Sequence, residues 1–264
     1  LAVAVLLLVA GCGQVDVRTL YAEAAAAAKR GELSEALEMA ERCHQAQPEN
    51  VRALCLYAFC LFATGQNLEA IENAKRAAQL APDDFIANYY YGWFLVESAE
   101  YGEKRFGDAL EPLERAYKLA GNFPEVFPDL LVLLGRCCLE QNLSKGSRYL
   151  QVLRKYEHFR QRPEVYNALG LLWVGQGEYP NAKENFREAL RRDPRSPAVL
   201  QNLAVLHDMY LNDPELAIVY YKRSQWARRR ANGTTGQEAI SRRLDQLQQE
   251  RMEPARDGTG EANR

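Results

Sequence analysis

The chain has 264 residues, of which 47% are hydrophobic and 26% are charged, and its formal net charge is −2. These values are typical of a globular chain, and the near-neutral charge argues against a general nucleic-acid binder, which needs a basic face. Alanine and leucine supply 36 and 35 residues, whereas valine and isoleucine supply only 15 and 4. Because helices favour alanine and leucine while strands favour β-branched residues, the composition predicts an all-α chain and nearly excludes an α/β enzyme with a buried sheet.

An unbroken apolar run, residues 1–10, opens the chain. It is shorter than the roughly 20 residues of a membrane span and fits the apolar core of a secretory signal, about 7–15 residues long. The run leads into Val9-Ala10-Gly11-Cys12, which resembles the bacterial lipobox, whose cysteine is diacylated and becomes the mature N-terminus. The alternative is an apolar N-terminus with an unmodified cysteine.

The lipobox resemblance implies a signal peptide over residues 1–11 and a lipidated N-terminus and linker over residues 12–16. Two or three acyl chains on Cys12 would anchor the protein stably, where a single chain would be marginal. The implied location is the bacterial cell envelope, and Gly13 after the lipidated cysteine points to the outer membrane facing the periplasm.

A 34-residue period runs through the rest of the chain and is clearest over residues 163–196. It has the pattern Tyr-x-x-Leu-Gly-x-x-Trp from Tyr166 to Trp173, then Ala-x-x-x-Phe from Ala182 to Phe186, and finally Pro194. This pattern resembles the tetratricopeptide repeat, a pair of antiparallel helices that stacks on further copies. Similar segments lie near residues 17–50, 51–84, 85–122, 128–160 and 197–226.

The repeat resemblance implies an all-α, right-handed α-solenoid of about six helix pairs over residues 17–226. The third copy has a long inter-helix segment, the second helix of the fourth is degenerate, and the sixth has one inserted residue in its turn. Residues 237–251 place Ile240, Leu244 and Leu247 on one helix face, which predicts a capping helix over the exposed end of the array. Residues 252–264 lack an apolar pattern and are predicted to be a disordered tail.

The sequence carries no known catalytic or cofactor-binding motif, so we predict a protein that is not an enzyme and that uses no cofactor or metal. His44, His158 and His207 fall in different repeats and are interpreted as packed or solvated side chains. Five cysteines follow Cys12 without zinc-binding spacing and are interpreted as small buried hydrophobic residues, namely Cys43, Cys55, Cys60, Cys137 and Cys138. One disulfide between Cys43 and Cys60 is the alternative.

The concave surface of a tetratricopeptide array comes from fixed positions of the first helix in each pair. Positions 5, 9 and 12 correspond here to Tyr21, Ala25 and Ala28; Cys55, Phe59 and Phe62; Tyr89, Trp93 and Val96; Val132, Arg136 and Leu139; Asn167, Leu171 and Val174; and Gln201, Val205 and Asp208. The resemblance therefore implies a partner groove containing Tyr21, Phe59, Phe62, Tyr89, Trp93, Val132, Arg136, Asn167, Leu171 and Gln201. Aromatic anchors are common binding hot spots. The alternative is that some of these rings pack under neighbouring helices or under the long segment of the third copy.

One subtype of the family holds a peptide carboxylate with lysine at position 5 and asparagine at position 9. The corresponding residues of the first copy are Tyr21 and Ala25, and those of the second are Cys55 and Phe59. The sequence therefore favours an apolar or helical partner segment over a charged chain end.

These features predict a non-catalytic scaffold or adaptor of the bacterial cell envelope that binds a protein or peptide partner in its groove, in assembly or secretion machinery. Its contact with the membrane would be the lipid on Cys12, and it would bind no nucleic acid. One alternative is an envelope glycan-binding protein or a regulator of a cell-wall or polysaccharide enzyme, with Tyr89 and Trp93 stacking on sugar rings. Another is a cytoplasmic adaptor whose gene start is misassigned.

Overall fold

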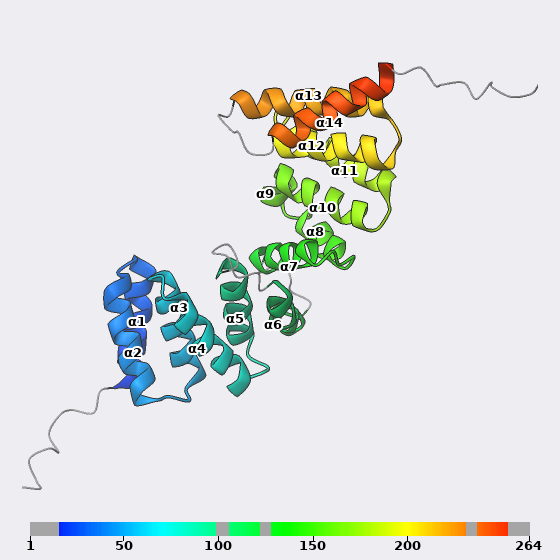
Figure 1. Ribbon diagram of the computed structural model, residues 1–264. Coiled ribbons are helices and arrows are strands. Elements are labelled where there is room, and N and C mark those ends of the chain that lie inside the picture. Colours follow the sequence, from blue (N-terminus) through cyan, green and yellow to red (C-terminus); the bar gives the residue numbers. More distant parts are fainter. Residues whose placement is uncertain (1–15, 99–105, 122–127, 231–236, 253–264) are drawn as a thin grey trace, which may run out of the picture. The chain divides into compact units, whose positions relative to one another are not determined.

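The computed structural model describes residues 16–98, 106–121, 128–230 and 237–252 (Figure 1). The predicted signal peptide, Cys12, the long segment of the third copy and nearly all of the predicted tail lie outside these residues. The described residues form helices and no strand. The helices are α1 (Val17–Arg30), α2 (Leu33–Ala46), α3 (Val51–Ala63), α4 (Asn67–Leu80), α5 (Phe85–Ser98), α6 (Phe106–Leu119), α7 (Pro128–Glu140), α8 (Gly146–Leu153), α9 (Glu157–Arg160), α10 (Pro163–Gly175), α11 (Tyr179–Arg192), α12 (Pro197–Val205), the π-helix η3 (Leu206–Tyr210), α13 (Pro214–Arg230) and α14 (Gln237–Met252).

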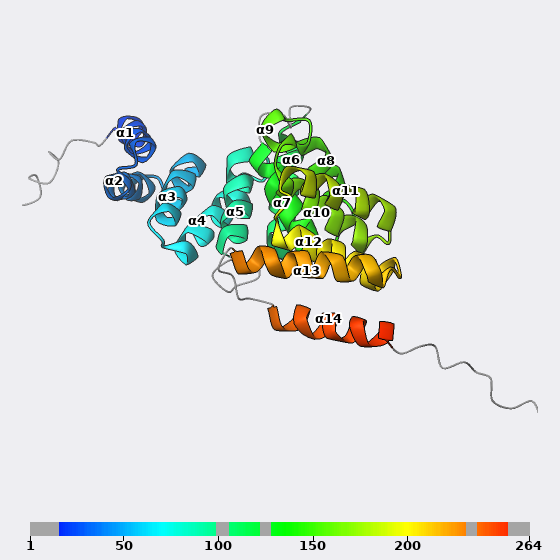
Figure 2. The same ribbon diagram turned by 90° about the horizontal axis from the view of Figure 1, so that it is seen from above.

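Consecutive helices pack as pairs, α1 with α2, α3 with α4, α5 with α6, α10 with α11 and α12 with α13 (Figures 1 and 2). Neighbouring pairs contact each other through α2 and α3, through α4 and α5, and through α11 and α12. The described fold is therefore an α-helical repeat fold, which confirms the all-α prediction. The chain divides into two compact units, residues 1–137 (unit 1) and 138–264 (unit 2), with the division inside α7.

Helix starts in this chain follow from ordinary capping chemistry. The side chain of Asn50 accepts hydrogen bonds from the backbone N–H groups of Arg52 and Ala53, at 3.1 and 3.2 Å, and so satisfies donors that the first turn of α3 leaves unpaired. Pro163 and Pro197 occupy the first turns of α10 and α12, where the missing N–H of proline costs little.

The close approach of α10 and α11 explains why the repeat needs a small residue in the middle of its first helix. A Cβ atom on Gly170 would lie 2.4 Å from Cε1 of Phe186, closer than two carbon atoms can pack. Ala182 and Ala189 of α11 are fully buried. The ring of Phe186 therefore fills the space that the glycine leaves, and the two helices pack at short distance.

The fourth and sixth copies differ from the regular helix pair in the length of one helix and in local backbone hydrogen bonding. In the fourth copy the second helix is the eight-residue α8, followed after a turn by the short α9. In the sixth copy α12 continues into η3, where the N–H of Leu211 donates to the carbonyl of Leu206 at 3.0 Å. A π-helical turn takes up one extra residue, which matches the insertion that the repeat spacing indicates in this copy.

The last helix, α14, runs beside α13 (Figures 1 and 2). Ile240, Leu244 and Leu247 are buried in one apolar cluster with residues of the sixth pair, Ala204, Ala217, Ile218 and Tyr221. The position of α14 is additionally fixed by Arg243, which donates to both carboxylate oxygens of Asp208, at 2.9 and 2.8 Å. The apolar face of α14 therefore covers the sixth helix pair.

The described cysteines of unit 1, namely Cys43, Cys55, Cys60 and Cys137, are buried. Cys43 and Cys60 are both free, so the structure has no bridge between them. Burial raises the pKa of Cys60 to about 11 and that of Cys55 to about 12, with a contribution from Asp84 at Cys55. These thiols stay protonated at neutral pH and behave as small apolar side chains.

The three histidines have three different environments. His44 stacks on Tyr57 with ring centroids 5.3 Å apart, and His158 is exposed. His207 is buried in η3, with Nδ1 3.3 Å from a carboxylate oxygen of Asp213, and burial lowers its pKa although Asp213 opposes this effect. Each belongs to a separate helix, and no group of three or more possible metal ligands forms among the described residues.

Candidate partner-binding surface

Five aromatic side chains of α3 and α5 gather on one side of unit 1, and we call them the aromatic patch: Phe59, Phe62, Tyr89, Tyr90 and Trp93. Trp93 lies at their centre, with ring centroids 5.7 Å from Phe62, 5.9 Å from Tyr90 and 6.0 Å from Tyr89. All five side chains are half-buried. Each ring therefore rests on the protein on one side and reaches solvent on the other.

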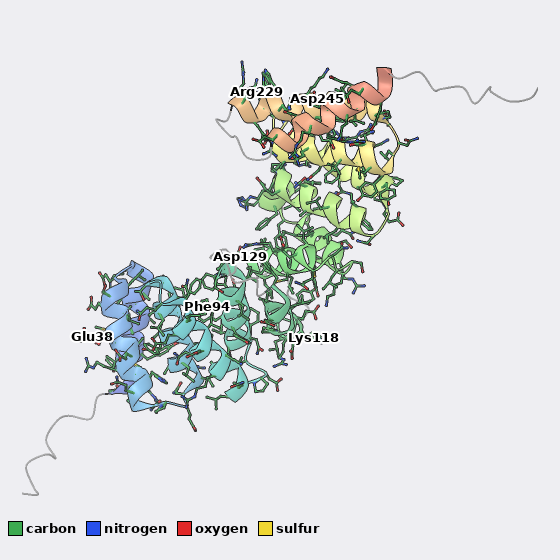
Figure 3. All side chains as sticks on the ribbon, in the orientation of Figure 1. Glu38, Phe94, Lys118, Asp129, Arg229 and Asp245 are labelled. Carbon is green, nitrogen blue, oxygen red and sulfur yellow. The ribbon has the colours of Figure 1, made fainter. Side chains whose placement is uncertain are left out.

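Phe94 forms the floor beneath this patch. Its side chain is fully buried, and its ring stacks on Phe62 with centroids 4.3 Å apart and an interplanar angle of 11°. Tyr90 and Trp93 contact the same ring, at 5.5 and 5.3 Å. Figure 3 labels Phe94 in the interior of unit 1. Such mutual packing fixes the exposed rings before any partner binds, which lowers the entropic cost of binding.

The first helix extends the patch along unit 1. Tyr21 of α1 is half-buried, and its pKa is raised by burial and by its proximity to Cys55. The pKa of Tyr90 is likewise raised by burial and by Cys55 and Tyr21. Tyr21 packs against the cluster that contains Ala53 of α3, and Tyr90 packs against the cluster that contains Cys55 of α3. The helices α1, α3 and α5 therefore contribute to one apolar surface.

Charged side chains border the patch on the side of α7. Arg136 donates a hydrogen bond to the carboxylate of Glu97 at 2.9 Å, and about a third of each side chain is exposed. Burial raises the pKa of Tyr89 to about 12, and the negative charge of Asp129, which Figure 3 labels, adds to this effect. Val132 is half-buried on the same helix, α7. The surface is therefore apolar at its centre and charged at this edge.

The candidate positions in unit 2 are more polar. The amide nitrogen of Asn202 donates to the side-chain oxygen of Asn167 at 2.8 Å, and Arg228 donates to the side-chain oxygen of Gln201. Leu171 is half-buried. These internal bonds hold Asn167 and Gln201 in fixed orientations, so unit 2 has no counterpart to the aromatic patch at these positions.

Four of the five residues of the aromatic patch stand at the register positions that are expected to line the groove. Cys55 and Val96, which the register also places there, are buried, and the side chain of Asp208 is only 2% exposed because Arg243 covers it. Tyr90, at position 6, was missed. Its ring lies 5.8 Å from Phe59, and the run of three tyrosines before Gly92 was the signal in the sequence that could have identified it.

The arrangement offers an apolar surface with a charged edge for contact with another molecule. Of the two acidic side chains near Tyr89, Glu97 is paired with Arg136. No helix within the described ranges is both long enough and apolar enough to cross a membrane. Paired helices with small residues at the crossings define a tetratricopeptide-like helical repeat protein.

Comparisons with known proteins agree with this fold. Residues 163–196 match the family described as tetratricopeptide repeat. The crystal structure of YrrB, described as a TPR protein with an unusual peptide-binding site, superposes with a TM-score of 0.61 and 16% identity, covering 78% of this chain and 97% of that one. No curated protein matches by sequence.

Two further solved structures have the same fold. PilW, described as a widely conserved type IV pilus biogenesis factor, gives a TM-score of 0.58 at 17% identity and covers 87% of this chain and 100% of its own. PilF of Pseudomonas aeruginosa gives 0.56 at 16% identity, with 86% and 97% covered. At these identities the likeness establishes the fold.

Proposed function

We propose that this protein is a non-catalytic scaffold of the bacterial cell envelope that binds an apolar or helical segment of a partner protein. The observation that carries the proposal is the aromatic patch, whose rings are held in place by Phe94 yet remain half-exposed. Rigid aromatic side chains with a charged border are typical of binding hot spots. The peptide-binding site attributed to YrrB and the pilus biogenesis role attributed to PilW support an interaction role on this fold.

A protein partner fits the patch better than a glycan does. Tyr89 and Trp93 stack on each other at 6.0 Å with an interplanar angle of 25°, and both also contact Tyr90. A sugar ring needs an open ring face, and here the faces are partly covered by neighbouring rings. The clustered edges suit the irregular apolar side chains of a peptide segment.

The location in the envelope rests on the lipobox-like sequence ending in Cys12 and on the apolar run before it. In this proposal Cys12 carries the lipid and the repeat array extends from it toward an assembly or secretion component. Radiolabelled palmitate should be incorporated into the protein and lost in the Cys12→Ser variant. Equal labelling of both chains would rule out the anchor, and it would leave the binding surface to be judged separately.

The binding surface is tested by the double variant Phe59→Ala with Trp93→Ala. Crosslinked pull-down from membranes of the source organism, followed by mass spectrometry, should recover a partner with the native chain and lose it with the variant. The matched control is Leu68→Ala with Leu80→Ala, which removes two exposed apolar side chains from α4. Retention of the same partner by the aromatic variant would refute the proposal.

The aromatic variant needs a folding check because its rings also contact each other. Aromatic pairs contribute about 0.5–1.5 kcal/mol beyond burial, so we expect a modest fall in melting temperature. Capture is therefore compared at a temperature where circular dichroism shows the variant to be folded.

A further inference from the structure

The outward side of α13 carries a dense group of cations that the partner surface of unit 1 does not use. Lys222, Arg223, Arg229 and Arg230 are exposed, and they surround Trp226, which is 48% exposed. None of the four pairs with a carboxylate in the part of the chain that the structure describes. We call these five residues the basic face of α13. Such a cluster is notable in a chain whose net charge is −2.

Helical spacing places the basic face on one side of α13. Ala217, Tyr221 and Ser224 of α13 are buried, and the basic face occupies the opposite arc. Figure 3 labels Arg229 at the end of α13. The one acid on this arc, Glu215, stands in the first turn, about two turns away from Lys222.

Apolar side chains share this arc with the cations. Leu216 and Val219 are 39% and 48% exposed, and they precede Trp226 along the same side of the helix. Arg230 and Arg195 place their guanidinium carbons 4.4 and 5.9 Å from the centre of the indole ring. The side of α13 that faces away from its core therefore combines aliphatic, indole and guanidinium groups.

Unit 1 has a pocket of about 590 Å³ whose lining is mostly polar. The hollow beside Trp226, in unit 2, has a mostly apolar lining. Its volume is about 440 Å³, and it is lined by apolar residues (Leu200, Pro194, Ala227) together with cations (Arg195, Lys222, Arg223). A hollow lined by both apolar and cationic side chains suits a molecule that joins an anionic group to hydrocarbon. Phospholipids have this construction.

We propose that the basic face of α13 docks on a bilayer surface that contains anionic phospholipid. Lysine and arginine near such a surface are attracted by its negative potential, and tryptophan favours the level of the headgroups. The long stems of the cations lie along apolar surface while their charged ends reach the phosphates. A nucleic acid would have no contact for Leu216 and Val219, and a specific acidic protein would require defined ion-pair geometry.

The test uses the unlipidated full chain, carrying Cys12→Ser, and two kinds of vesicle. One contains phosphatidylcholine alone, and the other contains phosphatidylcholine and phosphatidylglycerol in equal parts. The native surface should bind the anionic vesicles more tightly, and added salt should weaken this difference. Any binding by the apolar run at residues 1–10 occurs on both vesicles and cancels in the comparison.

A fourfold variant, in which Lys222, Arg223, Arg229 and Arg230 are replaced by Gln, removes the charges. At about fivefold per cation, its extra affinity for anionic vesicles should fall by more than about 100-fold. The matched control replaces four exposed cations of unit 1 by Gln, namely Lys29, Arg42, Lys75 and Arg76, and should keep the preference. Equal binding of the fourfold variant and the native chain would overturn the proposal.

Tryptophan fluorescence provides the second readout. Anionic vesicles should shift the native emission to shorter wavelength, and the shift should be absent in Trp226→Phe. Charge-dependent binding without a shift from Trp226 would overturn docking through this face. An equal shift produced by soluble poly-glutamate would instead assign the face to an acidic protein. Because no partner protein is present, failure here leaves the proposed scaffold function untouched.

Discussion

Arg243 of α14 donates hydrogen bonds to both carboxylate oxygens of Asp208, at 2.9 and 2.8 Å. Asp208 lies in η3, between α12 and α13. The hydroxyl of Tyr221 donates to the same carboxylate at 3.2 Å. The side chain of Asp208 is 2% exposed, so the hydrogen bonds from Arg243 and Tyr221 offset its lost hydration. The cap helix is thus attached to the array by a charge pair as well as by its apolar face.

Arg243→Ala should loosen the packing of α14 and destabilise unit 2. The variant leaves the buried carboxylate of Asp208 with only Tyr221 as a partner. Breaking a buried pair costs about 3–5 kcal/mol, and the one-third exposure of Arg243 reduces this to about 1–3 kcal/mol. Urea denaturation measures the loss, and faster amide exchange in α14 locates it. Arg242→Ala, at the exposed neighbouring position, is the control and should change stability by less than about 0.5 kcal/mol.

The same pair predicts an acid-sensitive part of the stability. The hydrogen bond from Arg243 lowers the pKa of Asp208, and burial opposes this effect without reversing it. Since the folded pKa lies below the unfolded value of about 3.9, the carboxylate stabilises the fold above that pH and loses its contribution as the pH falls through the folded pKa. The difference in unfolding free energy between native and Asp208→Asn should therefore be greatest near neutrality and shrink below about pH 4. A difference that grew with acidity would contradict the pairing.

Gly170→Ala should destabilise the α10–α11 pair. The added methyl group would meet the ring of Phe186 at 2.4 Å, and overpacking of this kind costs about 1–3 kcal/mol. The second-site change Phe186→Leu in the same chain should recover part of the loss, because it removes the clashing ring atoms. Thermal melts of the two single variants and the double variant test this coupling. Simple addition of the two single effects would show that the glycine is not required for the close approach.

The buried thiols of the described residues should be unreactive until the protein unfolds. With pKa values of about 12 at Cys55 and about 11 at Cys60, the thiolate is scarce at pH 8, and the side chains are buried. In a Cys12→Ser chain, Ellman's reagent should react slowly under native conditions and fully in denaturant. An added surface thiol, Ser34→Cys, should react at once and serves as the reference. Rapid native reaction without that thiol would mean that at least one helix carrying a buried cysteine is open to solvent.

The helix pairs could be predicted from the sequence because their requirement is local and repeated. A helix crossing needs a small residue at one position and a large residue four positions later. Ala182 and Phe186 follow this pattern, so the sequence predicts the crossing directly. The repeat spacing indicates an extra residue in the sixth copy, but it does not predict the local structure that this residue adopts. Either a π-helical turn or a longer loop can accommodate one extra residue. In the structure the N–H of Leu211 donates to the carbonyl of Leu206, so the extra residue forms a π-helical turn.

The candidate surface was predicted less completely, because it depends on which side chains cover which. Phe59 and Trp93 could be placed by their repeat positions, whereas the support that Phe94 gives to Phe62 depends on the exact rotation of α5 against α3. The pairing of Arg136 with Glu97 joins residues 39 apart in the chain. No periodic pattern encodes such a pair, since each partner alone fits any exposed helix position.

The attachment of α14 also affects how copies of this protein can meet. A repeat array ends in an apolar helix face, and the start of a second copy could extend it in a head-to-tail contact that never closes. Here that face is covered by Ile240, Leu244 and Leu247 of α14, and the hydrogen bond from Arg243 to Asp208 holds α14 in this position. In the described residues α14 therefore covers the apolar face of the sixth helix pair, so that face is not open to the first helix of a second copy.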